Sequence, residues 1–376
     1  MVRVLFLPES HRKQLTQSAG CAHCCVMTAR RITIRDIARE AGVHFTTVSR
    51  ALGRHPSIPE ATCQRIQQIA ERLGYVPDPM MAALMSYRPR LRTPSYHGNI
   101  AWVDNYPERE GWRHHEIYRK YHDGAQARAE ELGYKVEEFW LNEPGLTPRR
   151  ASDILSTRNI HGLLLCPQPS VGMSIQLEWD RFSAVTYGYT LASPPLHRVA
   201  SHTSFAMTEL IRQVRQLGCR RLGYVIAPSL DERIFNLWSG TFLTHQMHWP
   251  RKEHIPLQAL EKVEESKFLK WFERYRPEVI ISPDATLIDV LEKAGYRVPR
   301  DVGFASPSLV THPRKLSGVD ENSIEMGRAA MDMLAGMLHR NERGLPSIPY
   351  YLLVKGEWQR GATLPSAASI RRKSVS

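Results

Sequence analysis

The sequence of 376 residues has no run of eighteen apolar residues, so no membrane-spanning helix is expected. Its N-terminal segment contains a short apolar stretch at residues 4–8 but lacks the long apolar core and small-residue cleavage site of a secretory signal peptide. These two absences favour a cytoplasmic protein that makes no use of a membrane.

Motifs of the common enzyme classes are also missing. The sequence has no P-loop, no HExxH and no nucleophile elbow around a serine. It does contain sixteen histidines, and His114, His115 and Glu116 form a cluster that is compatible with a metal site. Solvated loop residues explain that cluster more simply, so we expect neither an enzyme nor a cofactor.

Cysteine is scarce, with six residues, and three of them lie close together as Cys21, Cys24 and Cys25. A Cys-x2-Cys pair beside a histidine is compatible with half of a zinc site, but no second half follows at the usual spacing. We therefore expect no bound metal. Disulfides are not expected either, because cytosolic thiols stay reduced.

Positive charge is in excess and is unevenly distributed. The net charge is +12, and residues 28–98 hold eleven arginines against five acidic residues, which gives +6 in under a fifth of the chain. A local basic excess of this kind permits binding to nucleic acid without proving it.

The pattern of residues 31–75 predicts three short helices. Thr33 and Asp36 form a capping box before the first helix, and Gly42 ends it with a tight turn. The second helix is expected over 45–52. The third is expected to start between Ser57 and Glu60 and to stop at Gly74. Two helices joined by such a turn are typical of a helix-turn-helix.

Polar side chains gather at the start of the second helix, the end that enters the major groove in this motif. Arg50 can bind a guanine through two hydrogen bonds, and Thr47 and Ser49 can bind phosphate oxygens. Phe45 and Thr46 are placed to contact base edges or a thymine methyl. A small three-helix domain without DNA is the alternative, but it leaves Phe45 at a helix start unexplained.

Residues 33–43 and 47–52 resemble the head-piece of the lactose and galactose repressor (LacI/GalR) family, and the match continues through Arg65, Ala70 and residues 73–77. The resemblance implies that residues 44–46 choose the bases, although His44 replaces the small serine usual in the family. It implies a DNA interface made of Thr33, Arg35, His44, Phe45, Thr46, Thr47, Ser49, Arg50 and Tyr75.

The same resemblance assigns a hinge helix to residues 80–85. Leu84 matches the leucine that wedges into the minor groove at the operator centre, where it kinks the duplex. Met81 is expected to add a DNA contact. The alternative is a short packed linker before the proline- and arginine-rich segment 88–94.

From residue 98 onward, apolar strand segments alternate with helical segments, which predicts parallel sheets with helices on both faces. We expect strands at 100–103, 136–141, 162–166, 184–187, 222–226, 279–282, 302–305 and 351–354. We expect helices at 117–132, 150–157, 203–217, 234–246, 266–275, 287–294 and 323–338.

The fold class is therefore a small all-α helix-turn-helix head-piece plus an α/β two-lobed sensor, which resembles the family's periplasmic-binding-protein-like domain. The expected boundaries are 1–30 for an extension that is disordered or a mis-called start, 31–76 for the DNA-binding domain, 77–97 for the hinge and linker, 98–364 for the sensor and dimerisation domain, and 365–376 for a disordered tail.

The sensor departs from the family at two sugar contacts. The clamping arginine aligns with Leu237, and an aspartate that follows a strand aligns near Ala305. Aromatic residues, including Trp102 and Tyr187, suit stacking on a sugar ring but equally suit core packing. The effector site is expected to be formed by Asn105, Tyr189, Arg233, Asn236, Trp249 and Asp284.

These observations predict a homodimeric DNA-binding regulator, by default a repressor. It is expected to bind a palindromic double-stranded operator and to respond to a small-molecule effector, a carbohydrate or a derivative of one. The alternative is a DNA-binding regulator whose sensor no longer takes a small ligand.

Overall fold

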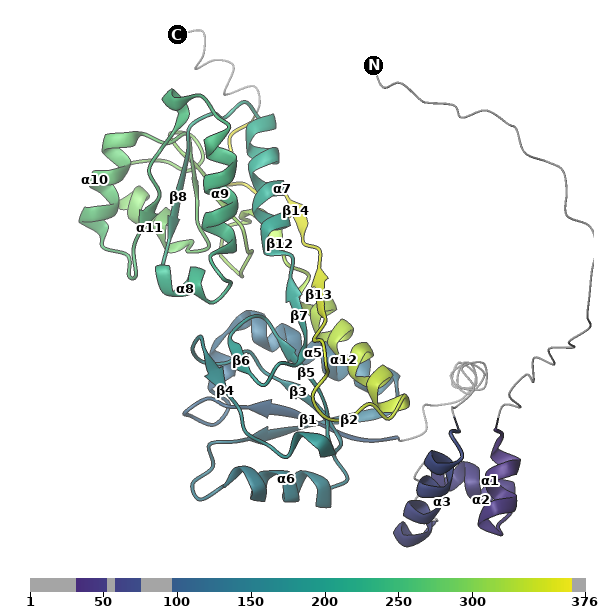
Figure 1. Ribbon diagram of the computed structural model, residues 1–376. Coiled ribbons are helices and arrows are strands. Elements are labelled where there is room, and N and C mark those ends of the chain that lie inside the picture. The colour runs from purple at the N-terminus through teal and green to yellow at the C-terminus, as the bar shows by residue number, and fades with distance from the viewer. Residues whose placement is uncertain (1–31, 53–57, 76–96, 367–376) are drawn as a thin grey trace, which may run out of the picture. The chain divides into compact units, whose positions relative to one another are not determined.

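The computed structural model describes residues 32–52, 58–75 and 97–366 and divides the chain into two units, with the boundary between Ser86 and Tyr87 (Figure 1). The predictions for the extension 1–30, for Met81 and Leu84 in the hinge, and for residues 367–376 of the tail lie outside the described residues.

The first unit contains the three predicted helices, α1 (Ile34–Ala41), α2 (Phe45–Leu52) and α3 (Glu60–Arg72). The predicted capping box is present, because the Asp36 carboxylate accepts from the Thr33 N–H at 2.9 Å and from its hydroxyl at 2.7 Å. Gly42 has φ 66°, a left-handed conformation that glycine adopts without strain and that ends α1. Apolar side chains from all three helices form one small core.

The first lobe of the second unit is built on a parallel sheet of six strands in the order β13-β7-β5-β3-β1-β2. Helices α5 (Glu116–Glu131) and α12 (Ser323–His339) cover one face, and α6 (Pro148–Thr157) covers the other. The strands are β1 (Gly98–Asp104), β2 (Tyr134–Trp140), β3 (Gly162–Leu165), β5 (Ser183–Tyr187), β7 (His197–Ser201) and β13 (Tyr351–Val354).

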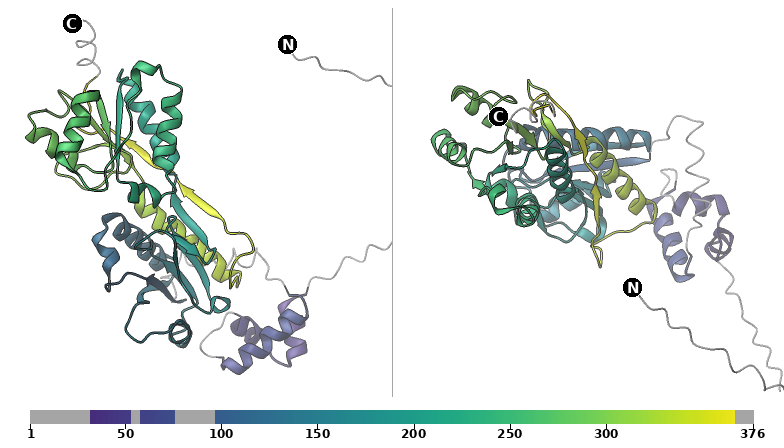
Figure 2. Two further views of the ribbon diagram at one scale, coloured as in Figure 1. Left: turned by 60° about the vertical axis from the view of Figure 1, so that its left-hand side comes forward. Right: turned by 90° about the horizontal axis from the view of Figure 1, so that it is seen from above.

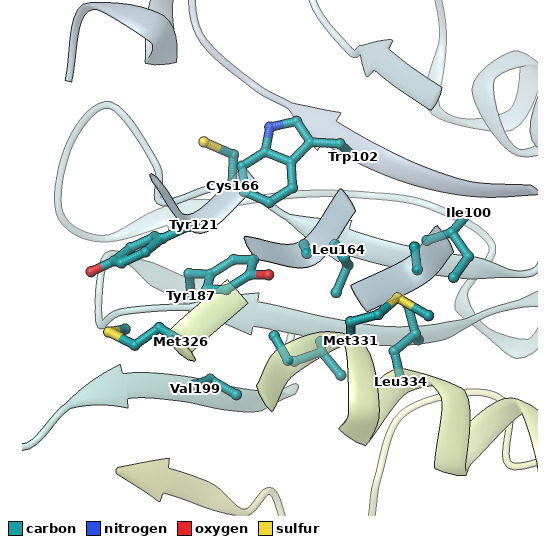
Figure 3. Packing of buried hydrophobic residues seen from close by; sticks show 14 of the residues in the cluster. Ile100, Trp102, Tyr121, Leu164, Cys166, Tyr187, Val199, Met326, Met331 and Leu334 are labelled. Carbon is teal, nitrogen blue, oxygen red and sulfur yellow. The ribbon is translucent and has the colours of Figure 1, made fainter. Parts of the chain in front are cut away.

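Figure 3 shows how the first face of this sheet is packed. Met331 and Leu334 of α12 lie against Ile100 and Leu164, and all four side chains are fully buried. Burial of side chains of this size contributes on the order of 1.5–3 kcal/mol each. This packing fixes α12 on the sheet.

The second lobe has a sheet in the order β14-β12-β11-β10-β8-β9, in which only β14 is antiparallel to its neighbour among the described strands. Helices α7 (Thr203–Gln216) and α9 (Leu237–Met247) pack on one face, and α10 (Glu265–Tyr275) and α11 (Thr286–Lys293) on the other. The strands are β8 (Leu222–Ile226), β9 (Gln258–Ala259), β10 (Val279–Ile281), β11 (Gly303–Ser306), β12 (Ser317–Asp320) and β14 (Glu357–Gln359).

The described chain passes between the lobes three times, from β7 to α7, from β12 to α12 and from β13 to β14 (Figures 1 and 2). Short elements complete the domain. They are β4 (Met173–Ser174), β6 (Leu191–Ser193), α8 (Pro228–Glu232), η2 (Gly111–His114), η3 (Trp179–Arg181) and η4 (Arg251–Glu253).

The predicted fold class is confirmed: a helical head-piece precedes an α/β domain of two lobes. Every predicted strand of the sensor corresponds to an observed one, but the sequence prediction missed β4, β6, β7, β9, β12 and β14. No helix within the described ranges has the length and apolar character needed to cross a membrane.

Candidate functional site

The start of helix α2 forms an exposed polar surface with one aromatic residue in it. Phe45 is 44% exposed, and His44, Thr46, Ser49 and Arg50 are also exposed. The opposite side of α2 is buried through Val48 and Ala51 against α1 and α3. The burial pattern therefore turns these candidate residues toward solvent.

His44 organises the first turn of α2. Its Nδ1 lies 2.8 Å from Thr46 Oγ1 and 3.4 Å from the Thr46 backbone nitrogen, so the ring approaches a helix N–H that lacks a partner within the helix. Its ring also lies 4.3 Å from that of Phe45. His44 thus positions the two residues predicted to choose the bases.

Helix α1 contributes to the same surface. The Arg35 guanidinium lies 5.9 Å from the Phe45 ring centre, and Thr33 and Arg35 are exposed. Tyr75 differs, since it is half-buried against the core of the head-piece. Helix α3 supports the arrangement through Arg65, whose Nη2 donates to the Ala41 carbonyl at 3.2 Å.

A second candidate site is a cavity of about 120 Å³ between the two lobes of the sensor. Its lining includes residues at the ends of strands and on the segments that connect the lobes. The lining residues are Ile117, Tyr118, Tyr121, Pro167, Gly188, Tyr189, Thr190, Ser201, Thr203, Leu230, Arg233, Ile234, Trp238, Ser308 and Glu321.

Arg233 reaches from the second lobe into the first. Its Nη1 donates to the Pro169 carbonyl at 2.8 Å, and its Nη2 donates to the Gln168 carbonyl at 2.7 Å and to the Tyr118 hydroxyl at 2.9 Å. A guanidinium presents its donors in a fixed fork, which suits several acceptors at once. The side chain therefore links the lobes at one end of the cavity.

A second polar contact links the lobes at Glu116. Its carboxylate accepts from the Thr311 N–H at 3.0 Å and from the Thr311 hydroxyl at 2.7 Å, and it pairs with Lys120 at 2.7 Å. Partial burial acts to raise the pKa of Glu116, but these contacts outweigh it and lower the pKa to about 2. Glu116 is thus an anion in this contact at neutral pH.

Glu321 is the carboxyl group of the cavity, and it is only 8% exposed. Burial disfavours its charged form and raises its pKa to about 7, an effect that the Ser201 and Ser308 hydroxyls partly offset. Both serines thus favour the ionised form of Glu321, but burial outweighs them.

The six predicted effector residues are not brought together. Tyr189 and Arg233 line the cavity, whereas Asp284 lines a separate hollow in the second lobe. Asn105 donates to Gln168 at 3.0 Å, and Asn236 is exposed with φ 55° before α9. Trp249 packs against the core formed under α7 and α9.

Trp102 and Tyr187, the other aromatic candidates, are fully buried in the first lobe, as Figure 3 shows. They therefore serve core packing. No group of three or more His, Cys, Asp or Glu that could hold a metal ion occurs among residues 32–52, 58–75 and 97–366. Cys21, Cys24 and Cys25 lie outside the described residues.

Sequence reasoning missed most of the cavity, including Tyr118, Tyr121, Trp238 and Glu321. Glu321 follows β12, a strand of four residues with no alternating pattern that was not predicted. A usable signal was the pair Asp320 and Glu321 directly before the well-patterned helix α12.

Comparison with known proteins finds matches to both parts of the chain. Residues 33–78 match the model of bacterial regulatory proteins of the lacI family, and residues 211–356 match a periplasmic binding protein-like domain. The chain thus combines a helix-turn-helix of the lacI family with a periplasmic binding protein-like domain. The three helices of the head-piece lie within the first match.

The curated relatives of higher identity resemble this chain in the head-piece. The regulator PtxS of Pseudomonas putida is 43% identical over 65 residues, or 17% of this chain and 19% of its own length. The probable repressor ExuR of Bacillus subtilis is 51% identical over 47 residues, or 12% of this chain and 14% of its own. The chain thus matches less than a fifth of the length of each of these two relatives.

Longer matches have lower identity. The regulator NtdR of the NTD biosynthesis operon of Bacillus subtilis is 22% identical over 354 residues, which cover 86% of this chain and 98% of its own. The regulator CelR in complex with cellobiose has a TM-score of 0.51 at 15% identity, and the lac repressor dimer bound to operator and the anti-inducer ONPF has 0.50 at 14%. Both comparisons cover 89% of this chain and 100% of the solved chain, and they support the fold.

Proposed function

We propose that this protein is a LacI-type transcription regulator that binds a specific sequence of double-stranded DNA. The observation that carries the proposal is the exposed surface at the start of α2, where Phe45, Thr46 and Arg50 extend from a helix held by its buried side. A recognition helix enters the major groove with this end and reads base edges there. Such a regulator acts in the bacterial cytoplasm, where the DNA is.

The protein is proposed to bind as a homodimer, because a palindromic operator presents its half-sites with twofold symmetry. Each head-piece binds one half-site of the operator. Leu84, which lies outside the described residues, is proposed to kink the operator centre with its copy in the second subunit, with Met81 beside it. Binding over a promoter gives repression.

The cavity between the lobes is proposed to hold a small-molecule effector, a carbohydrate or a derivative. Tyr118, Tyr121 and Trp238 offer aromatic surface, and Arg233 and Glu321 offer polar groups. A ligand that contacts both lobes changes the balance between their arrangements, which is how a sensor of this kind controls its DNA-binding domains.

The alternative that the sensor takes no ligand has one observation in its favour. Arg233 already bonds three oxygens of the first lobe, so the lobes are linked without an effector. In that case operator binding is constitutive or depends on a protein partner.

DNA selection from a random pool, with the full chain at fixed salt, tests the proposed function. A palindromic consensus is expected. Arg50→Ala is expected to relax the preference at one base pair of each half-site and to cost about 1–3 kcal/mol in affinity for the consensus.

Arg39→Ala is the matched control, because it removes the same charge from α1 outside the recognition helix, where the side chain is 77% exposed. It is expected to weaken binding to all sequences alike. Recovery of no consensus by the wild-type chain, or an unchanged base preference in Arg50→Ala, contradicts the proposal.

A further inference from the structure

Glu321 lies where the chain crosses between the lobes, directly after β12 and two residues before α12. Its side chain lines the cavity and is more than nine-tenths buried. Among the described residues, no lysine, arginine or histidine forms an ion pair with it. A carboxylate so deeply buried is costly unless a positive charge accompanies it.

Arg233 does not supply that charge. Its guanidinium is committed to the carbonyls of Gln168 and Pro169 and to the Tyr118 hydroxyl. Within the described ranges, the charged group that acts on Glu321 is Asp320, which is itself negative and raises the pKa of Glu321 further. The Ser201 and Ser308 hydroxyls favour the ionised form, but no positive charge among the described residues balances it.

The surroundings of Glu321 suit a cation. Tyr118, Tyr121 and Tyr189 line the same cavity, and the negative charge of Glu321 reaches each of these tyrosines, since it contributes to raising the pKa of all three. Trp238 lines the cavity as well. Aromatic faces attract an ammonium group within about 6 Å, by about 2 kcal/mol or more where water is excluded.

We propose that the cavity takes a ligand with a protonated amine, such as an amino sugar or another hydroxylated amine, and that Glu321 among the tyrosines is its ammonium subsite. This inference rests on the proposed role of the cavity as the effector site, and it narrows the effector class. Hydroxyl groups of the ligand have Ser201, Thr203 and Ser308 as partners in the lining.

Proton release is a second consequence. The pKa of Glu321 in the empty cavity is about 7, because burial favours the neutral form. An ammonium group favours the ionised form, so binding below pH 7 expels the Glu321 proton. The titratable and charged groups around Glu321 in the described residues are Asp320, which acts on it directly, and Tyr118, Tyr121, Tyr189 and Arg233, which line the same cavity. Burial raises the pKa of each of the three tyrosines above its ordinary value, away from neutrality.

Calorimetry on the full chain at about pH 7 tests the subsite with matched pairs of probes. The pairs are glucamine and sorbitol, D-glucosamine and D-glucose, and ethanolamine and ethylene glycol, each up to about 100 mM, which detects even weak binding. At least one amine is expected to bind tenfold or more tightly than its hydroxyl analogue. Binding at about pH 6.5 is expected to release protons, seen as a difference in heat between two buffers.

Glu321→Gln removes the charge at constant shape and is expected to reduce the amine preference to threefold or less and to abolish proton release. Glu325→Gln, on the exposed first turn of α12, is the control and is expected to change neither. If each amine and its analogue bind equally, or if Glu321→Gln keeps the amine preference, the proposal of an ammonium subsite is contradicted. The proposal that the cavity binds an effector is not contradicted by that result. If none of the amines binds, the subsite is equally wrong, and the DNA selection decides separately on the regulator.

Discussion

At the scale of single residues, Glu321 makes folding stability depend on pH. Burial raises its pKa from the ordinary value of 4.5 to about 7, so the folded state holds the proton more tightly than the unfolded state. The contribution is fully present below pH 4.5 and is lost as the pH rises to 7 and above. Relative to Glu321→Gln, the wild type is expected to lose on the order of 3 kcal/mol of unfolding free energy between pH 4.5 and 8.

Denaturant unfolding of both chains across this pH range measures the difference directly. Other groups titrate in both proteins, so only the gap between the two curves reports on Glu321. Glu325→Gln is expected to give a curve parallel to that of the wild type, because Glu325 is 65% exposed. Parallel curves for Glu321→Gln would mean that the carboxyl is not buried.

The positions of the residues in the proposed DNA-binding surface were predictable from the sequence, and the cavity was not. Thr33, Gly42 and Arg50 owe their positions to capping, a turn and helical spacing, which are local and can be read from a few neighbouring residues. Tyr118 and Glu321 lie some two hundred residues apart in the sequence and meet only through the paths of α5 and α12. No local pattern carries that information.

At the scale of elements, the crossing of α5 and α12 positions the cavity wall. Gly124 and Gly327 lie at the contact, and a Cβ at Gly327 would fall 2.1 Å from the Tyr121 carbonyl oxygen. Tyr121 itself lines the cavity. The two glycines therefore let the helices approach closely enough to hold this ring in place.

Gly327→Ala is expected to destabilise the protein by about 1–3 kcal/mol or more, because backbone atoms must move to admit the methyl group. Denaturant unfolding measures the loss. Gly336→Ala, later in α12, is the control, since its nearest neighbour would be the flexible Arg340 side chain at 3.0 Å. That change is expected to be neutral or to stabilise by about 0.5–1 kcal/mol. Equal free energies of unfolding for the two variants would contradict the close approach of α5 and α12 at Gly327.

Helices were predicted more completely than strands for a physical reason. A helix such as α12 repeats its buried side over seventeen residues, so its period is clear in the sequence. Strands β7 and β12 have five and four residues, nearly all buried, and show no alternation. Their pairing with β5 and β11 depends on contacts distant in the sequence.

At the scale of the whole molecule, the segments that connect the lobes also carry ligand-facing groups. Ser201 ends β7 and Thr203 begins α7, and Glu321 lies between β12 and α12. A ligand that pairs with Glu321 thus acts directly on the chain segments about which the lobes can move. Arg233 and Glu116 oppose that movement through their hydrogen bonds between the lobes.

The proposed homodimer makes a further demand on the operator. One head-piece presents only a few base-reading residues, so tight binding requires that the second head-piece bind at a high effective concentration.

An insertion of about five base pairs between the half-sites turns one of them by half a helical turn, since a turn takes about 10–10.5 base pairs. It is expected to reduce affinity for the selected operator to that for a single half-site, as measured by fluorescence anisotropy at fixed salt. An operator with one half-site scrambled sets that lower limit. Undiminished affinity after the insertion would show that the two head-pieces bind independently. That result would contradict the proposal that a symmetric dimer binds a palindromic operator.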